Sequence, residues 1–140
     1  MFIKKYEERL RIWSSFRDEL EEVEDPFRFL LDFYKQAPRV SIATDPYNRE
    51  SWPDPWQLLE ENQYCDFTRV LAYCYSLQLT ERFKDSKIEI HIITTGLETY
   101  YLLQVDNWIF GYEEDRAIDK SELPPDFHPQ VVYDMTDVNK

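Results

Sequence analysis

The sequence contains little glycine and little cysteine, and each shortage excludes a kind of site. Its 140 residues include two glycines, Gly96 and Gly111, and two cysteines, Cys65 and Cys74. Loops that cradle phosphates need several glycines at short spacing, so nucleotide-dependent chemistry is not expected. The two cysteines and two histidines form no close pair at the spacing of zinc ligands. We therefore expect no metal and no cofactor.

Long apolar runs are also missing. No uninterrupted apolar stretch approaches the ~18 residues that a membrane span requires. The charged residues Glu7, Glu8 and Arg9 interrupt the first segment, where a signal peptide would have its apolar core. These features predict a cytoplasmic protein that does not bind membranes. Cys65 and Cys74 fall on opposite faces of one predicted helix, so we expect them to be reduced thiols.

Positive charge is scarce as well. The chain has 16 Lys and Arg residues against 28 Asp and Glu residues, which gives a formal net charge of −12. A surface with this excess repels phosphate backbones and anionic lipids, so direct nucleic-acid binding is disfavoured. A solvated acidic face is one explanation. The other is imitation of nucleic acid, through which the chain would occupy a basic partner.

Aromatic residues, by contrast, are abundant. Ten Tyr, nine Phe and four Trp belong to a composition that is 43% hydrophobic, which is enough to form a core in a chain of this length. We expect a single domain over residues 1–140. Within it, residues 1–36 form N-terminal helices, residues 54–112 form a helix and an antiparallel meander, and residues 113–140 form an acidic, proline-containing segment over the surface.

Apolar spacing and capping residues predict four helices. Apolar residues recur every three or four positions from Phe2 to Val23, which is typical of an amphipathic helix. An aspartate followed by a proline favours a helix start because the aspartate caps free backbone amides and proline suits the first helical position. The remaining helices are expected at residues 26–36, from Pro55 to about Asn62, and from Cys65 or Asp66 to the polar run at 84–87.

The β structure is expected to follow the last helix. Residues 88–95 alternate, with Ile88, Ile90 and Ile92 on one face and Glu89, His91 and Ile93 on the other. Turns at 96–97 and 106–107 lead into further strands at 99–105 and 108–112. Residues 131–133 add an edge strand, and residues 40–43 a short extended piece. The predicted fold class is α+β, with about four helices packed on a three- to four-stranded antiparallel sheet.

The stretch Trp52-Pro53-Asp54-Pro55-Trp56-Gln57-Leu58-Leu59, followed by Tyr64-Cys65-Asp66-Phe67, resembles the nucleophile region of the transglutaminase-like branch of the papain-like cysteine hydrolases. The resemblance covers residues 52–112 and implies a transglutaminase-like fold. It also implies a nucleophilic cysteine at the start of a helix, with a histidine and an acid on the strands that follow. Small acidic chains of this kind also resemble orphan proteins of tailed bacteriophages.

The physical chemistry of that arrangement suits Cys65, because amides and the dipole at a helix N-terminus stabilise a thiolate. The sequence departs from the family pattern at the base and the acid. Thr99 or Tyr100 stands where the histidine is expected, and residues 110–112 read Phe-Gly-Tyr where the acid is expected. A catalytic site would therefore combine Cys65 with His91, one strand earlier, or take help from His128 in the tail.

Three functional hypotheses remain open from the sequence. The leading one is a non-catalytic, transglutaminase-like domain that binds another protein, with a homodimer through its aromatic surface as one form. The alternatives are a cysteine hydrolase or acyltransferase that uses Cys65 and His91, and an acidic nucleic-acid mimic. A binding groove between the cysteine-led helix and the sheet would be lined by Trp52, Trp56, Tyr64, Tyr100 and Trp108, although core packing explains these residues equally well.

Overall fold

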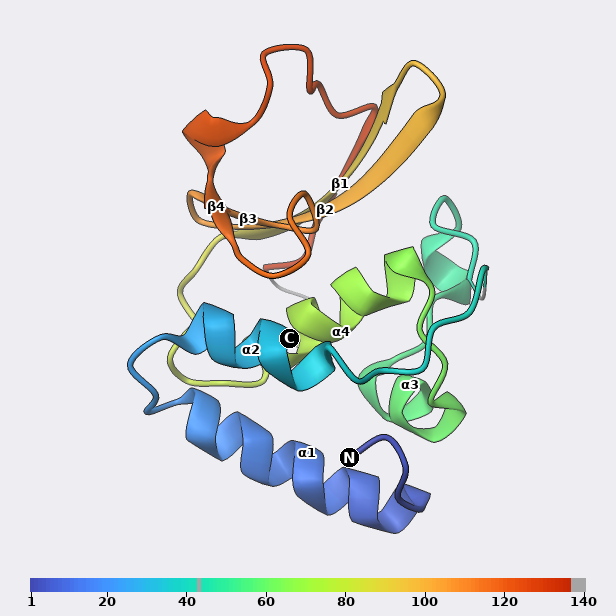
Figure 1. Cartoon of the computed structure of the whole chain (residues 1–140), viewed down its shortest axis with the longest axis vertical. Helices are drawn as coiled ribbons and strands as arrows, with labels where there is room; N and C mark the ends of the chain where they lie inside the picture. Colours follow the sequence, from blue (N-terminus) through green and yellow to red (C-terminus); the bar gives the residue numbers. More distant parts are fainter. Residues whose placement is uncertain (43, 137–140) are drawn as a thin grey trace.

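The computed structural model describes residues 1–42 and 44–136. In these residues the chain forms four α-helices and a five-stranded antiparallel sheet, so the expected α+β class and the four expected helices are confirmed. The helices lie against one face of the sheet (Figure 1). No helix in the described part of the chain is long and apolar enough to cross a membrane.

Helix α1 (Tyr6–Leu20) is shorter at both ends than the apolar pattern from residue 2 to residue 23 predicts. Phe2 precedes the helix and is still 93% buried, because its ring packs edge-on against Tyr64 with centroids 5.6 Å apart. The apolar spacing at the start of the chain therefore reflects burial of a non-helical segment as well as a helix face.

Helices α2 (Pro26–Tyr34) and α3 (Pro55–Glu61) both begin at the aspartate–proline signals in the sequence. At α3, Asp54 accepts a hydrogen bond from the Gln57 backbone N–H at 2.8 Å, and the Gln57 side chain accepts one from the Asp54 N–H at 2.9 Å. This reciprocal pair satisfies two amides that have no partner within the helix. Local capping thus determines both helix starts.

The C-terminus of α3 is capped from a distance by Arg9 of α1. The Arg9 side chain is buried, and its Nε donates to the carbonyl of Leu59 at 2.9 Å while Nη2 donates to that of Glu60 at 3.1 Å. Asn62, at the end of α3, adopts the left-handed conformation with φ of 52°. The bonds from Arg9 satisfy the carbonyls of Leu59 and Glu60 and hold α3 against α1.

Helix α4 (Asp66–Gln78) is the central helix, and residues 67–77 are all buried. It ends several residues before the polar run that was expected to end it. The following turn is held instead by α1: Arg82 Nη1 donates to the carbonyls of Leu20, at 3.2 Å, and Val23, at 2.7 Å. Contacts with the end of α1 therefore override the continuing helical pattern.

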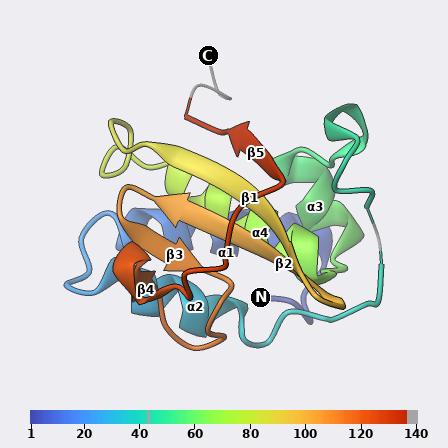
Figure 2. The ribbon, with the colours of Figure 1, turned by 90° about the horizontal axis from the view of Figure 1, so that it is seen from above.

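The sheet is ordered β4-β3-β2-β1-β5, with neighbouring strands antiparallel. The strands are β1 (Ile88–Thr95), β2 (Glu98–Val105), β3 (Trp108–Phe110), β4 (Ile118–Asp119) and β5 (Val131–Asp134). The meander and the edge strand near residue 131 were expected, but β4 was not, so the sheet has five strands in the described residues instead of three or four. Seen from above, β5 runs along β1 at one edge (Figure 2).

Both faces of the sheet carry buried apolar residues. Ile88, Ile90 and Leu103 face the helices, whereas Ile93, Leu102, Ile109 and Ile118 form a smaller cluster on the outer face. The expectation that residues 113–140 simply lie over the surface is therefore wrong at Ile118, which is 1% exposed. A two-residue strand was too short to show an alternating pattern in the sequence.

The extended piece expected at residues 40–43 is not a strand in the described residues. Arg39 forms an isolated bridge with Tyr64, and the Val40 N–H donates to the Tyr64 carbonyl at 3.2 Å. Residue 43 lies outside the described part of the chain. The bridge holds the segment after α2 next to the residue that precedes Cys65.

Candidate functional site

Cys65 occupies the N-cap position of α4, as the sequence predicted, and is 4% exposed. Its backbone N–H donates to Thr68 Oγ1 at 2.8 Å, and the same hydroxyl donates to Cys65 Sγ at 3.4 Å. The thiol belongs to the apolar core between the helices and the sheet. Its surroundings are therefore those of a packed side chain at a helix start.

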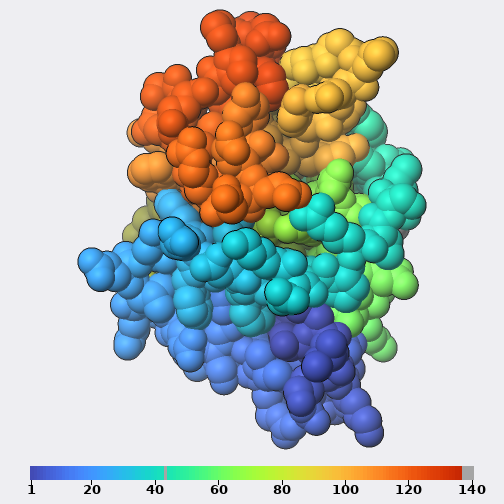
Figure 3. Space-filling view, in the orientation of Figure 1, coloured from blue at the N-terminus to red at the C-terminus, as the bar shows by residue number. Residues whose placement is uncertain are grey.

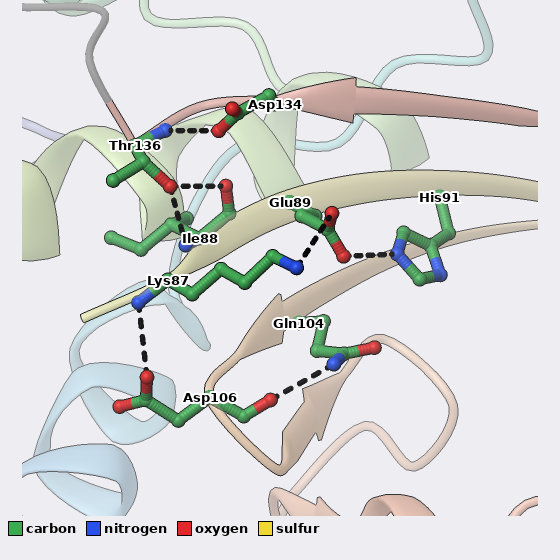
Figure 4. Close-up of polar contacts among 8 residues, drawn as sticks. All are labelled: Lys87, Ile88, Glu89, His91, Gln104, Asp106, Asp134 and Thr136. Carbon is green, nitrogen blue, oxygen red and sulfur yellow. Dashed lines mark hydrogen bonds and ion pairs between the residues drawn. The ribbon is translucent and has the colours of Figure 1, made fainter.

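His91 lies on the outer face of the sheet. Its Nε2 is 3.1 Å from Glu89 Oε1, and Lys87 Nζ is 3.8 Å from Glu89 Oε2 (Figure 4). Successive side chains of a strand point to opposite faces, and Ile90, the neighbour of His91, faces the core that contains Cys65. The structure thus places Cys65 and His91 on opposite sides of the sheet and does not form the predicted dyad. His128 is exposed in the loop before β5.

The thiol of Cys74 provides a test of how tightly α4 is packed. Cys74 is fully buried in α4, and burial raises the pKa of its thiol well above the usual range, so thiolate is scarce at neutral pH. In a Cys65→Ala variant we expect iodoacetamide to label Cys74 at least about 100-fold more slowly in the native than in the denatured protein. Rapid native labelling would show that α4 opens readily.

The five aromatic residues that were predicted to line one groove are distributed over the molecule. Their closest ring partners differ: Trp52 packs on Tyr133, Trp56 on Trp13, Tyr64 on Phe2, Tyr100 on Phe127 and Trp108 on Phe27. Tyr64 is 1% exposed and belongs to the core, whereas Tyr100 packs on the outer face of the sheet. The structure does not bring the five together in a groove.

A cleft of about 250 Å³ lies between the cysteine-led helix α4 and β2, next to the loop after β3, and of the five predicted residues Tyr100 alone lines it. α4 contributes Asp66, Arg69 and Tyr73, β2 contributes residues 99–101, and the loop contributes Gly111, Glu113 and Glu114. On the face shown in Figure 3, the loop after β3 (orange) approaches the segment after α2 (cyan), with part of α4 (green) next to them. We call this space the α4–β2 cleft.

The edge of β2 is open along this cleft. β2 pairs with β1 over its whole length, but its pairing with β3 reaches only to Leu103, opposite Phe110. Asp106 N–H donates to the Lys87 carbonyl at 2.9 Å. In an antiparallel pair every second residue hydrogen-bonds to the same neighbour, so Asp106 and every second residue before it bond to β1. It follows that Thr99 and Tyr101 point their backbone N–H and C=O away from β1, where no strand pairs with them in the described part of the chain.

Arg69 is the buried charge of the cleft. The residue is 8% exposed, and its Nη2 donates to Tyr73 Oη at 3.3 Å. Its Nε is buried without a hydrogen-bond partner, and no carboxylate of a described residue lies within 4.0 Å of the guanidinium. Buried charges in proteins are normally paired, because an uncompensated one costs several kcal/mol. Arg69 therefore has unused capacity for an acceptor.

Carboxylates surround this guanidinium at a greater distance. Glu114 pairs with Arg39, Oε1 to Nη2, at 2.8 Å, whereas Asp66 and Glu113 form no ion pair with a described residue. Burial raises the pKa of Tyr73 to about 12, with a smaller lowering by Arg39 and a raising by Glu114. The cleft thus combines two unpaired acids at its rim with one buried cation at its wall.

Sequence reasoning missed Arg69 and the acids of the loop. One signal was present in the apolar residues of 67–77, among them Phe67, Val70 and Leu71. A helix this apolar is buried on most sides, so an arginine within its first turns needs a partner. The position of the loop after β3 gave no such signal, because it depends on where the pairing of β2 and β3 ends.

Metal chemistry has no geometric support in the described residues, where no group of three or more His, Cys, Asp or Glu side chains is arranged to hold an ion. No protein-family model matches the chain, and no curated protein or solved structure matches it either.

Proposed function

We propose that the protein is a non-catalytic, transglutaminase-like domain that binds a short, basic, extended segment of another protein in the α4–β2 cleft. The observation that carries the proposal is the open edge of β2 along the cleft. An extended peptide can add to such an edge through main-chain hydrogen bonds, while side-chain pockets next to it supply specificity. Thr99 provides its N–H and C=O and Tyr101 its N–H, whereas Gly111 lies against the Tyr101 carbonyl.

The length of the open edge limits the ligand. Residues 99–101 span about 10 Å of strand, so two or three residues of the partner can pair there. The cleft of about 250 Å³ has room for a segment of similar size. The loop with Gly111 and Glu113 flanks the edge, and Gly111 lies against the Tyr101 carbonyl. A short linear segment therefore fits the site better than a folded surface.

The charges favour a basic segment. Asp66 and Glu113 at the cleft are free to pair with Lys or Arg side chains, and the net charge of −12 attracts a cationic partner over a distance. The ring of Tyr101, partly exposed beside them, offers a further surface for a cation. The main-chain pairing with β2 then determines the orientation of the bound segment.

The absence of a Cys65–His91 contact supports the non-catalytic part of the proposal. A nucleophilic cysteine needs a base within hydrogen-bond reach, and the sheet separates Cys65 from His91. A cysteine at the start of a helix, followed by antiparallel strands, agrees with the transglutaminase-like resemblance. The nucleic-acid mimic and the homodimer stay predictions.

The edge pairing can be tested at Thr99. Selection from randomised peptide libraries, one with free C-termini and one with the random segment inside a loop, is expected to enrich peptides that contain Lys or Arg. Thr99→Pro removes the N–H that faces the cleft and leaves the ladder with β1 intact, so it is expected to weaken peptide binding about tenfold. Thr99→Val keeps this N–H and should bind like the wild type.

The charge contribution has its own matched controls. Asp66→Asn with Glu113→Gln is expected to weaken binding about tenfold, whereas Glu7→Gln with Asp18→Asn on α1 makes the same change in net charge and should alter it by less than about twofold. Equal losses in the two pairs would mean that the long-range field alone attracts the peptides. Failure of both libraries to enrich any sequence would contradict the proposed function.

A further inference from the structure

We infer that the α4–β2 cleft receives the C-terminal residue of the partner chain, whose terminal carboxylate pairs with Arg69. The inference rests on the proposed function and adds to it the part of the partner that binds. The site then takes a peptide with a basic side chain and a free α-carboxylate. The rim acids hold the side chain, and the buried guanidinium holds the carboxylate.

The geometry of Arg69 supplies the first argument. Nη1 and Nη2 form one edge of the planar guanidinium, and a carboxylate can accept two parallel hydrogen bonds from that edge. Nη1 donates to no described residue, and Nη2 makes one bond of 3.3 Å, to Tyr73 Oη, and has a second hydrogen, whereas Nε is enclosed by the protein. A carboxylate therefore compensates the buried charge without displacing a strong contact.

The extent of the site supplies the second argument. The open stretch of β2 is three residues long, and the cleft next to it is bounded by α4 on the side of Arg69. A chain that ran along β2 in the direction of Leu103 would meet the loop at Gly111, which lies against the Tyr101 carbonyl. A chain end needs only one exit. A terminal carboxylate also differs from an Asp or Glu side chain, because it leaves the basic side chains of the segment free to meet Asp66 and Glu113.

The test compares synthetic peptides that differ only at the C-terminus. A basic peptide from the free-C-terminus library is made with a carboxylate and with a carboxamide, and both are titrated by fluorescence polarisation. Amidation is expected to weaken binding to the wild type about tenfold or more. In Arg69→Gln the two forms should bind equally, and in Arg39→Gln, a matched loss of a nearby exposed arginine, the preference for the carboxylate should persist.

Each outcome separates the inference from the proposed function. Equal binding of both peptides to the wild type overturns the inference while the binding function stands, and this comparison does not depend on a variant that folds. Enrichment of peptides from the loop library alone would also overturn the inference and leave the binding function standing, because these peptides have no free C-terminus. A preference for the carboxylate that persists in Arg69→Gln would also overturn the assignment, because another group would then hold the terminus.

Discussion

Raising the pH to about 11 is expected to remove about 5 kcal/mol from the free energy of unfolding, because four buried tyrosines ionise more readily in the unfolded chain. Burial raises the pKa of Tyr64 and of Tyr73 to about 12, and raises that of Tyr34 and Tyr75 further. The folded state thus retains protons that the unfolded state loses above its tyrosine pKa of about 10. The contribution of these tyrosines to stability is complete below that pH and falls as the pH rises.

The magnitude follows from the linkage between protonation and folding. Between the unfolded pKa of about 10 and the raised folded value, each tyrosine costs about 1.4 kcal/mol per pH unit. Four such groups approach the total stability of a typical domain, about 5–15 kcal/mol, so the protein is expected to unfold cooperatively near pH 11. The hydroxyl of Tyr75, which donates to the Pro53 carbonyl at 2.7 Å, also loses this bond on ionisation.

Tyrosinate absorbance and circular dichroism, recorded on the same samples, provide the measurement. The two signals should change together, and Tyr64→Phe should lessen the loss of stability between neutral pH and about pH 11 by about 1.4 kcal/mol. Tyr47→Phe is the control, because Tyr47 is exposed, and its replacement should leave the dependence on pH unchanged. Complete tyrosinate formation in a protein that stays folded would contradict the prediction.

Gly111→Ala is expected to destabilise the protein by about 3 kcal/mol. Gly111 has a φ of 101°, a conformation that residues with a side chain rarely adopt, and an added Cβ would lie 2.5 Å from the Tyr101 carbonyl oxygen. That oxygen belongs to the backbone of β2, which is held by β1, so it cannot move away cheaply. The loop would have to shift instead.

Gly96→Ala is the matched control. Gly96 also has a positive φ, of 59°, but an added Cβ would meet nothing within 4 Å. Its replacement is expected to cost about 1 kcal/mol, the cost of the backbone conformation alone. Denaturant unfolding of the two variants compares them directly. Similar losses would mean that the close approach of Gly111 to β2 is easily relieved.

The parts of the fold that depend on local signals were predictable. Asp25 and Asp54 each cap a helix at the predicted residue, and the alternation in 88–95 gave β1 with its faces as observed. These features are encoded within a few residues. The end of α4 was not predictable, because Arg82 donates hydrogen bonds to carbonyls at the end of α1, more than fifty residues earlier in the sequence.

The site was less predictable than the fold. The alternation of β1 already separated His91 from Ile90, but the sequence did not show which face would pack on the helix that Cys65 begins. The resemblance implied a histidine near residue 99, His91 was the substitute one strand earlier, and the packing places it on the other side of the sheet from Cys65. The α4–β2 cleft depends on where β3 stops pairing with β2, so neither Arg69 nor Glu113 could be assigned to it beforehand.

The position of β5 has a consequence for folding. β1 pairs with β2 across a tight hairpin, but it pairs with β5 only after the whole of segment 96–130 has been closed into a loop. Closing a loop of this length costs conformational entropy before any hydrogen bond forms, which raises the contact order of the domain and slows this step. Until it is complete, the second edge of β1 is exposed and can pair with another chain. We therefore expect the β1–β5 ladder to limit the folding rate and to be the part of the sheet most prone to aggregation during synthesis.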